Sequence, residues 1–190
     1  MDAAETFECN GHTVEIHYDE CEAAIGPRGD DPLVKIILFG KAKPYGDEHD
    51  YRMQDYAGWA ELRAAVAKDH PGGVVKPVFI FDHSGIALST TDAWFRAVDS
   101  AGWDWCQVGV AVVSGDRIRE VFGKQRISKK LREAVEGYVD DEVTTQGRYV
   151  NGEWFYWLVK DAEGEIVDSV GGYVGIEHAI EAAREYAETL

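Results

Sequence analysis

The pattern of apolar and polar residues predicts a β-hairpin near each end of the chain. Within residues 6–18, Asn10-Gly11 separates two alternating segments, which is the strongest short-range hairpin signal. Near the other end, Glu163-Gly164 separates residues 154–160 from residues 166–173. A turn between two such segments predicts the second hairpin.

Nearly continuous apolar runs between the two hairpins predict buried strands. These runs are residues 33–39, 74–81 and 107–114. The turn-forming residues 82–85 follow the second run and lead into a short strand at 86–89. Residues 40–55 are polar, and we expect a loop there.

Apolar residues repeat with the helical period in four segments. These are residues 56–70, 116–122, 128 to about 149, and 176–190. Ser128 is the predicted N-cap of the longest helix, and Gly147 is a weak point near its end. Strands and helices come in blocks, which predicts an α+β fold with a mainly antiparallel sheet, flanking helices and two hairpins. We expect one domain over residues 1–190, with a candidate subdomain joint near 40–55.

Composition favours a folded protein. Of the 190 residues, 45% are hydrophobic and 12% aromatic, which is enough apolar material for a core. No apolar run approaches the ~18 residues of a transmembrane helix, and residues 1–5 lack the features of a secretory signal. The cysteines are Cys9, Cys21 and Cys106, an odd number without a CxxC pair, which is typical of a reducing cytoplasm.

The charge balance is strongly acidic, with 35 Asp and Glu against 19 Lys and Arg, a net −16. This disfavours direct binding to nucleic acid or to anionic membranes. Residues 117–132 are the exception, because they hold seven bases and one acid. Arg126, Lys129 and Lys130 in this basic segment are candidate anion contacts; alternatively, the segment pairs with the acidic remainder of the chain.

An acidic stripe follows the last predicted helix, opposite its apolar face, and consists of Glu177, Glu181, Glu185 and Glu188. Its charges are ~5 Å apart at ~1.5 Å rise per residue, against ~1.7 Å for duplex DNA. Imitation of a duplex therefore requires a second acidic ribbon. The candidates are Asp47, Glu48, Asp50 and Asp55, or Asp140, Asp141 and Glu142. The stripe is either a surface that a partner binds or a solvated face that keeps the protein in solution.

Catalytic motifs are missing from the sequence, which has no P-loop, GxGxxG, HExxH, GxSxG or zinc-finger spacing. Asp82-His83-Ser84 holds the residue types of a triad, but adjacent residues of an extended chain point apart. We therefore expect no enzyme activity and no cofactor. The alternative is a small metal-assisted hydrolase or nuclease that uses Asp47, His49, Asp50 and His83.

Four aromatic residues lie within twelve positions: Trp94, Phe95, Trp103 and Trp105. A segment that covers the sheet would bury these rings in the core. Exposed rings would instead be interface anchors, since Trp is enriched in binding hot spots. Trp94, Trp103 and Trp105 are thus interface candidates, and a homodimer or larger oligomer with a structural or regulatory role is a further alternative.

Five segments, in order, resemble a family of uncharacterised phage and prophage proteins. They are Gly46-Asp47-Glu48-His49-Asp50-Tyr51, Phe81-Asp82-His83-Ser84-Gly85-Ile86, Gln107-Val108-Gly109, Arg126-Ile127-Ser128-Lys129-Lys130, and Val167-Asp168-Ser169 before Gly171-Gly172-Tyr173. The resemblance covers residues 12 to 175, which makes 176–190 a C-terminal helical extension. Members of the family carry Trp-Asp-Ser-Gly-Gln-Val-Gly, whereas this chain has Trp105-Cys106 in place of the two small residues.

The resemblance implies an origin in a mobile element and a place in the cytoplasm of a bacterial host cell, but it supplies no catalytic residues. Small acidic phage proteins of this kind resemble inhibitors of host defence, such as anti-CRISPR or antirestriction proteins. Defence effectors hold nucleic acid in positive channels, which an acidic protein can fill. The expected partner is therefore a nucleic-acid-binding host defence complex, and the expected role is stoichiometric inhibition.

Overall fold

Helices and antiparallel strands make up the described chain, which confirms the α+β prediction. The computed structural model describes residues 3–19, 28–29 and 31–190; Cys21 lies outside them. Contacts divide the chain into two compact units: unit 1 is Met1–Pro27 with Arg148–Leu190, and unit 2 is Arg28–Gly147. The sequence predicts one domain with a candidate joint near 40–55, but residues 40–55 lie inside unit 2.

The elements of unit 1 are β1 (Glu5–Cys9), β2 (His12–Tyr18), β7 (Trp154–Lys160), β8 (Ile166–Val174) and α5 (Ile176–Ala187). Those of unit 2 are β3 (Lys35–Leu38), the 3₁₀ helices η1 (Gly40–Tyr45) and η2 (Met53–Asp55), α1 (Trp59–Asp69), β4 (Val74–Asp82), β5 (Ile86–Ser89), α2 (Ala93–Val98), β6 (Trp105–Val113) and α3 (Gly115–Phe122). Helix α4 (Lys129–Val150) lies mostly in unit 2, and its last three residues, 148–150, belong to unit 1.

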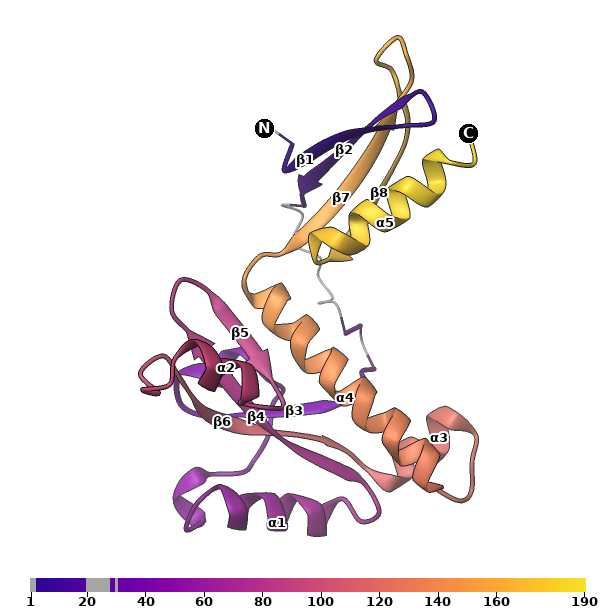
Figure 1. The fold of residues 1–190 in the computed structure, drawn as a ribbon. Coiled ribbons are helices and arrows are strands. Elements are labelled where there is room, and N and C mark those ends of the chain that lie inside the picture. Colours follow the sequence, from indigo (N-terminus) through magenta and orange to yellow (C-terminus); the bar gives the residue numbers. More distant parts are fainter. Residues whose placement is uncertain (1–2, 20–27, 30) are drawn as a thin grey trace. The chain divides into compact units, whose positions relative to one another are not determined.

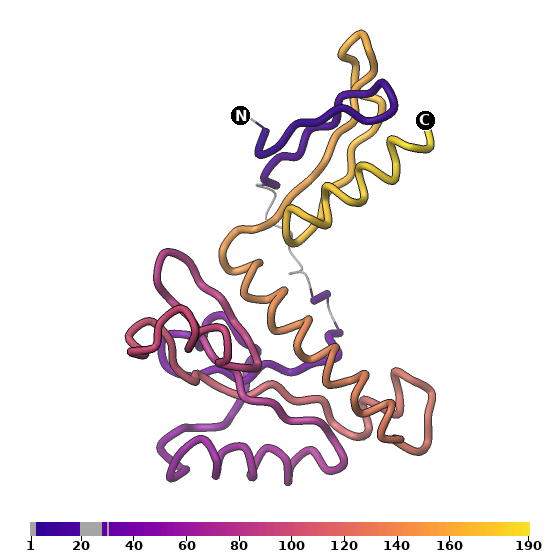
Figure 2. The backbone as a smooth tube through the Cα atoms, viewed as in Figure 1, coloured from indigo at the N-terminus to yellow at the C-terminus, as the bar shows by residue number. Residues whose placement is uncertain are grey.

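Unit 1 joins the two ends of the chain in one antiparallel sheet with the strand order β1-β2-β7-β8 (Figures 1 and 2). Both predicted hairpins are present, and β2 pairs with β7, with Ile16 opposite Trp157. At the first turn Asn10 and Gly11 have φ values of 50° and 81°, the positive φ pair that a two-residue type I′ turn requires.

Helix α5 supplies one side of the core of unit 1. Ala179, Ala183 and Ala187 recur every four residues and are fully buried against the apolar face of the sheet. Small side chains let the helix approach aromatic residues such as Trp157, which stacks on Tyr186 at 5.1 Å between ring centroids. The sequence predicts 176–190 as a C-terminal helical extension; in the structure α5 packs into the core of unit 1, and without it this sheet face has no cover within the described chain.

Unit 2 is a four-stranded antiparallel sheet with the strand order β3-β6-β4-β5. The predicted buried runs form β3, β4 and β6, and the two longest lie in the middle of the sheet. Helix α1 packs Leu62 and Val66 on one face, and α4 packs Val135, Val139 and Val143 on the other, where α3 also contributes (Figure 1).

Gly147 allows α4 to pack closely on β5. A Cβ atom at Gly147 would lie 2.7 Å from the backbone nitrogen of Leu88, so only glycine fits without a shift. The sequence indicates a weak point here, but the helix continues to Val150. Ser128 accepts a hydrogen bond from the backbone N–H of Leu131 at 3.2 Å, as expected for an N-cap. None of the described helices is both long and apolar enough to cross a membrane.

Candidate functional site

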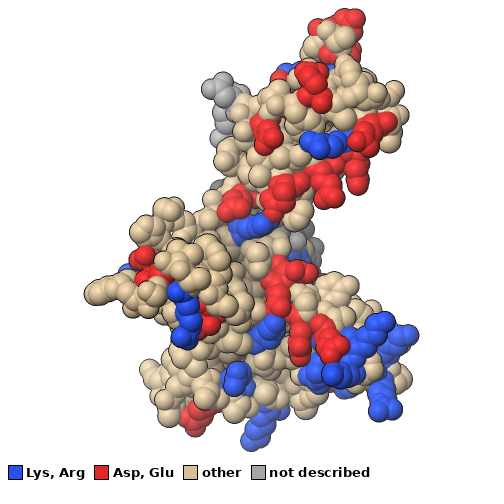
Figure 3. Space-filling view, viewed as in Figure 1, with Lys and Arg blue, Asp and Glu red and all other residues tan. Residues whose placement is uncertain are grey.

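The acidic stripe of α5 lies on the solvent side of the helix. Glu177, Glu181, Glu185 and Glu188 are all exposed, because the alanine stripe fixes which side of α5 faces the sheet. Figure 3 shows carboxylates following this helix. Glu177 pairs with Arg148, and its pKa is lowered by a hydrogen bond from its own backbone N–H and by Arg148. The other three form no ion pair with any residue that the structure describes.

The two units share the charge very unequally. Unit 1 holds 16 Asp and Glu against three Lys and Arg, a net −13, whereas unit 2 holds 19 against 16, a net −3. Each base of unit 1 already has a contact: Arg148 with Glu177, Lys160 with Glu15, and Arg184 over the Phe7 ring at 5.1 Å. The acidic character of the protein is therefore a property of unit 1.

A second group of carboxylates in unit 1 lies at the β7–β8 turn, where Asp161, Glu163 and Glu165 occur within five residues. The Asp161 carboxylate accepts the backbone N–H groups of Glu163 at 3.0 Å and Glu165 at 2.9 Å, which fixes the turn. The side chains of Glu163 and Glu165 are exposed.

The predicted second ribbons in unit 2 are largely neutralised by internal contacts. Arg28 binds both Asp47 at 2.9 Å and Glu142 at 3.2 Å, and Asp140 bonds to Lys76 and Thr90. Burial raises the pKa of Glu142, against the opposing effect of Arg28. Asp55 pairs with Arg52 at 3.3 Å. Glu48, Asp50 and Asp141 remain exposed without an ion pair to any described residue, so they do not make a continuous ribbon.

The basic segment 117–132 is partly paired and partly open. Arg117 pairs with Asp31 and Glu120, Arg119 with Asp116, and Lys129 with Glu133 at a long 3.7 Å. Arg132 donates to the carbonyl oxygens of Gly72 and Gly73. The candidate anion contacts Arg126 and Lys130 are exposed, and neither pairs with a described residue; Figure 3 shows basic side chains gathered over α3 and the start of α4.

The aromatic segment is divided between core and surface. Phe95 is buried, whereas Trp94 and Trp103 expose 58% and 87% of their surface. Trp105 is half-buried, with its indole N–H bonded to the Asp99 carbonyl oxygen at 2.9 Å and the Arg96 guanidinium 5.1 Å from its ring centroid. Trp94 contacts Phe81 and Phe95, so Trp103 is the most open of the interface candidates.

The metal alternative is not supported by the described residues, in which no group of three or more His, Cys, Asp or Glu could hold a metal ion. Asp47 is bound by Arg28 and by the Ile36 N–H, at 2.6 Å. His49 contacts the Leu38 carbonyl oxygen at 2.9 Å. His83 instead pairs with Asp104, at 3.0 Å.

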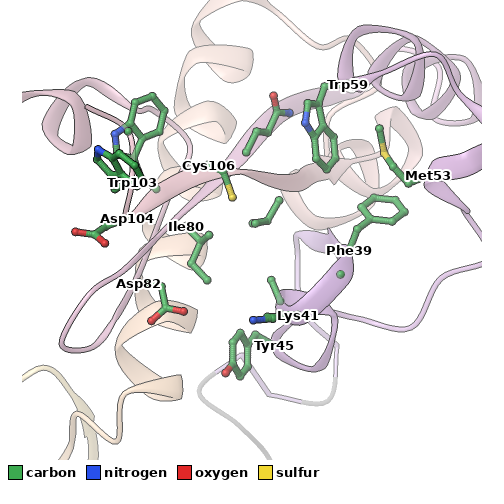
Figure 4. Close-up of a pocket in the computed structure, with 16 residues that line it drawn as sticks. Phe39, Lys41, Tyr45, Met53, Trp59, Ile80, Asp82, Trp103, Asp104 and Cys106 are labelled. Carbon is green, nitrogen blue, oxygen red and sulfur yellow. The ribbon is translucent and has the colours of Figure 1, made fainter. Parts of the chain in front are cut away.

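Unit 2 also contains a groove of about 810 Å³ beside the first half of β6 (Figure 4). Aromatic and apolar residues line it at one end, including Phe39, Met53 and Trp59, and Asp82 and Trp103 lie at the other end. The sequence does not predict this groove, because β3 and β6 are far apart in sequence and the groove depends on where β3 stops along β6. The unequal charge of the two units is also not evident without the fold, although residues 1–27 contain no Lys or Arg.

Comparisons of this chain with protein-family models, with curated proteins and with solved structures found no match.

Proposed function

We propose that this protein is a non-enzymatic inhibitor from a phage or another mobile element, and that unit 1 binds a positively charged, nucleic-acid-binding surface of a host defence complex. The observation that carries the proposal is the net −13 of unit 1, combined with the exposed row of Glu181, Glu185 and Glu188. The mobile-element origin rests on the segment resemblance. Both together favour an anti-CRISPR or antirestriction role.

The mechanism follows from electrostatics. A channel that holds nucleic acid presents Lys and Arg to phosphates, and a folded acidic surface competes for the same side chains. The acidic stripe of α5, from Glu177 to Glu188, spans ~16 Å over eleven residues at ~1.5 Å per residue. One row is sparser than a duplex, so it would compete at a few phosphate positions, with the Asp161–Glu165 turn as a second point of contact.

The test is direct inhibition. Purified protein is titrated into a panel of defence effectors, each an RNA-guided nuclease or a restriction enzyme, and DNA binding is followed by fluorescence anisotropy at 50 and 300 mM NaCl. We expect inhibition of one effector at near-equal molar ratio, weakening at high salt because screened charges attract less. A panel in which no effector forms a complex with the protein would overturn the proposal.

A matched pair of variants locates the surface. Glu181→Gln, Glu185→Gln and Glu188→Gln together remove three charges from α5, while Glu48→Gln, Asp50→Asn and Asp141→Asn together remove three exposed charges from unit 2. We expect the first variant to weaken inhibition at least ten-fold and the second to change it little. Equal effects would mean that net charge matters and the α5 surface does not.

A further inference from the structure

Among the described residues, the first half of β6 has no neighbouring strand on the side where β3 pairs with its second half. Strand β3 ends at Leu38, opposite Gly109, and the last bond on that side runs from the Phe39 N–H to the Val108 carbonyl oxygen at 2.9 Å. Strand β6 begins four residues before Gly109, at Trp105. In the part of the chain that the structure describes, residues 105–107 therefore pair with β4 alone.

The ladder with β4 shows which backbone groups face the open side. The Asp82 N–H donates to the Asp104 carbonyl oxygen at 2.8 Å, which makes these two a hydrogen-bonded pair. Hydrogen-bonded and non-hydrogen-bonded pairs alternate in an antiparallel ladder. Ile80 and Cys106 are the next bonded pair, so Trp105 and Gln107 direct their N–H and C=O groups away from β4.

The groove follows this open edge and has different walls on the two faces of the sheet. Phe39, Met53 and Trp59 belong to the apolar cluster on the α1 face. Ile80 belongs to the cluster on the α4 face of the sheet. Cys106 is paired opposite Ile80 and Asp82 lies two residues further along β4, so both side chains are on this same face. Figure 4 shows Trp103, Asp104 and Asp82 on one side of the groove, Met53 and Phe39 on the other, and Cys106 between them. A groove with walls on both faces of the sheet fits a chain whose side chains alternate.

We infer that the groove binds an extended peptide segment of a partner protein, which adds to the sheet as a strand beside β6. Backbone groups of the peptide would bond to Trp105 and Gln107, as in other cases of strand addition. Side chains on one side of the peptide would enter the apolar wall at Met53 and Trp59. Trp103 would cover the other end of the bound segment.

Charge specifies one position of the peptide. Asp82 and Asp104 lie at the Trp103 end of the groove. The groove lining contains these two carboxylates and one ammonium group, that of Lys41. The Asp82 side chain is exposed and makes no ion pair with the described residues. The favoured segment therefore carries Lys or Arg on the side that faces Asp82, with apolar residues before and after it.

The probe is a displayed library of random nine-residue peptides, selected against the full chain. We expect enriched peptides with one basic residue between two large apolar residues, and binding that protects the exposed Cys106 thiol from iodoacetamide at least five-fold. Failure to enrich any peptide would overturn the inference. If Cys106 became protected without peptide as the protein concentration increased, a second copy of the chain would occupy the edge. That result would also overturn the inference.

Two variant pairs test the geometry. Gln107→Pro removes the edge N–H while leaving the β4 bonds in place, and Gln107→Ala removes the same side chain but keeps the N–H. We expect at least ten-fold weaker peptide binding for the proline variant and less than three-fold for the alanine variant. Trp103→Ala should weaken binding, and Trp94→Ala, an exposed tryptophan outside the groove, should not. Equal binding by all four variants would contradict strand addition, and circular dichroism of each shows whether it is folded.

Discussion

Lys160 Nζ lies 2.6 Å from Glu15 Oε1, although 145 residues separate them in the sequence. The pair connects β2 to β7 on the sheet face opposite the alanine stripe of α5. His17 Nε2 lies 3.0 Å from the second oxygen of the same carboxylate. The hydrogen bond from Lys160 lowers the pKa of Glu15, and that from His17 lowers it further.

This pair predicts a pH-dependent contribution to stability. Because the folded-state pKa of Glu15 lies below the unfolded value, its contribution is present above the unfolded pKa and is lost as the pH falls through the folded pKa. We expect Glu15→Gln to lower the free energy of unfolding by about 0.5–1 kcal/mol at pH 7, a range set by the partial exposure of the pair. Below about pH 4 the difference should shrink.

Urea unfolding at several pH values measures this difference in the free energy of unfolding, with Glu5→Gln as the control on an exposed carboxylate. A difference that does not change with pH would contradict the assignment.

The two glycines inside α4 predict opposite effects of the same substitution. Gly147→Ala places a methyl group 2.7 Å from the Leu88 nitrogen, and we expect a loss of ~1–3 kcal/mol from the resulting shift. Gly137 has open space where the methyl group would be, so Gly137→Ala should gain ~0.5–1 kcal/mol through helix propensity. Chemical denaturation of both variants checks this, and the same sign for both would refute it.

Removal of α5 tests its role in the core. A chain that ends at Gly175 leaves Val14, Ile16 and Trp157 uncovered on one sheet face. We expect β1, β2, β7 and β8 to lose protection in hydrogen exchange measured by mass spectrometry, together with increased binding of a hydrophobic dye. A chain that ends at Glu188 keeps the helix and should retain protection. If the shorter chain kept full protection, α5 would not be required for the core of unit 1.

Asp99 organises the loop that carries Trp103. Its carboxylate accepts the backbone N–H groups of Ala101, Gly102 and Asp104, and the bond from Asp104 is the largest cause of its lowered pKa. We expect Asp99→Ala to accelerate amide exchange of residues 101–104 at least ten-fold at pH 7. Since the folded pKa of Asp99 is lowered, the same bonds should weaken in the wild-type chain as the pH falls through that value. Ser100→Ala is the local control; unchanged exchange in Asp99→Ala would contradict the role.

The sequence predicts the local elements well, because the signals are local. Asn10-Gly11 favours a tight turn because both residues tolerate positive φ, and Ser128 favours a helix start through its own hydroxyl group. The polar segment 40–55 forms two short 3₁₀ helices instead of a simple loop, and α2 lies inside the aromatic segment. Helices of three to six residues are too short to show a helical repeat of apolar residues in the sequence, and they depend on packing for their stability.

The candidate site was less predictable, since it depends on which distant residues meet. The acids of α5 are exposed as the helical period predicts, but Asp47 and Glu142 are neutralised by Arg28, more than a hundred residues from Glu142. No local pattern identifies such a partner. Likewise, the open edge of β6 exists only because β3 ends early.

The sheet of unit 1 also sets an order of events during synthesis. Its first hairpin is made before unit 2, but β7 and α5 are made after unit 2, and a two-stranded hairpin is marginally stable by itself. At roughly 5–20 residues per second, the ~135 residues between β2 and β7 take about 7–27 s. During that interval unit 2 can finish folding, while β1 and β2 keep an uncovered apolar face until β7 and α5 have been made.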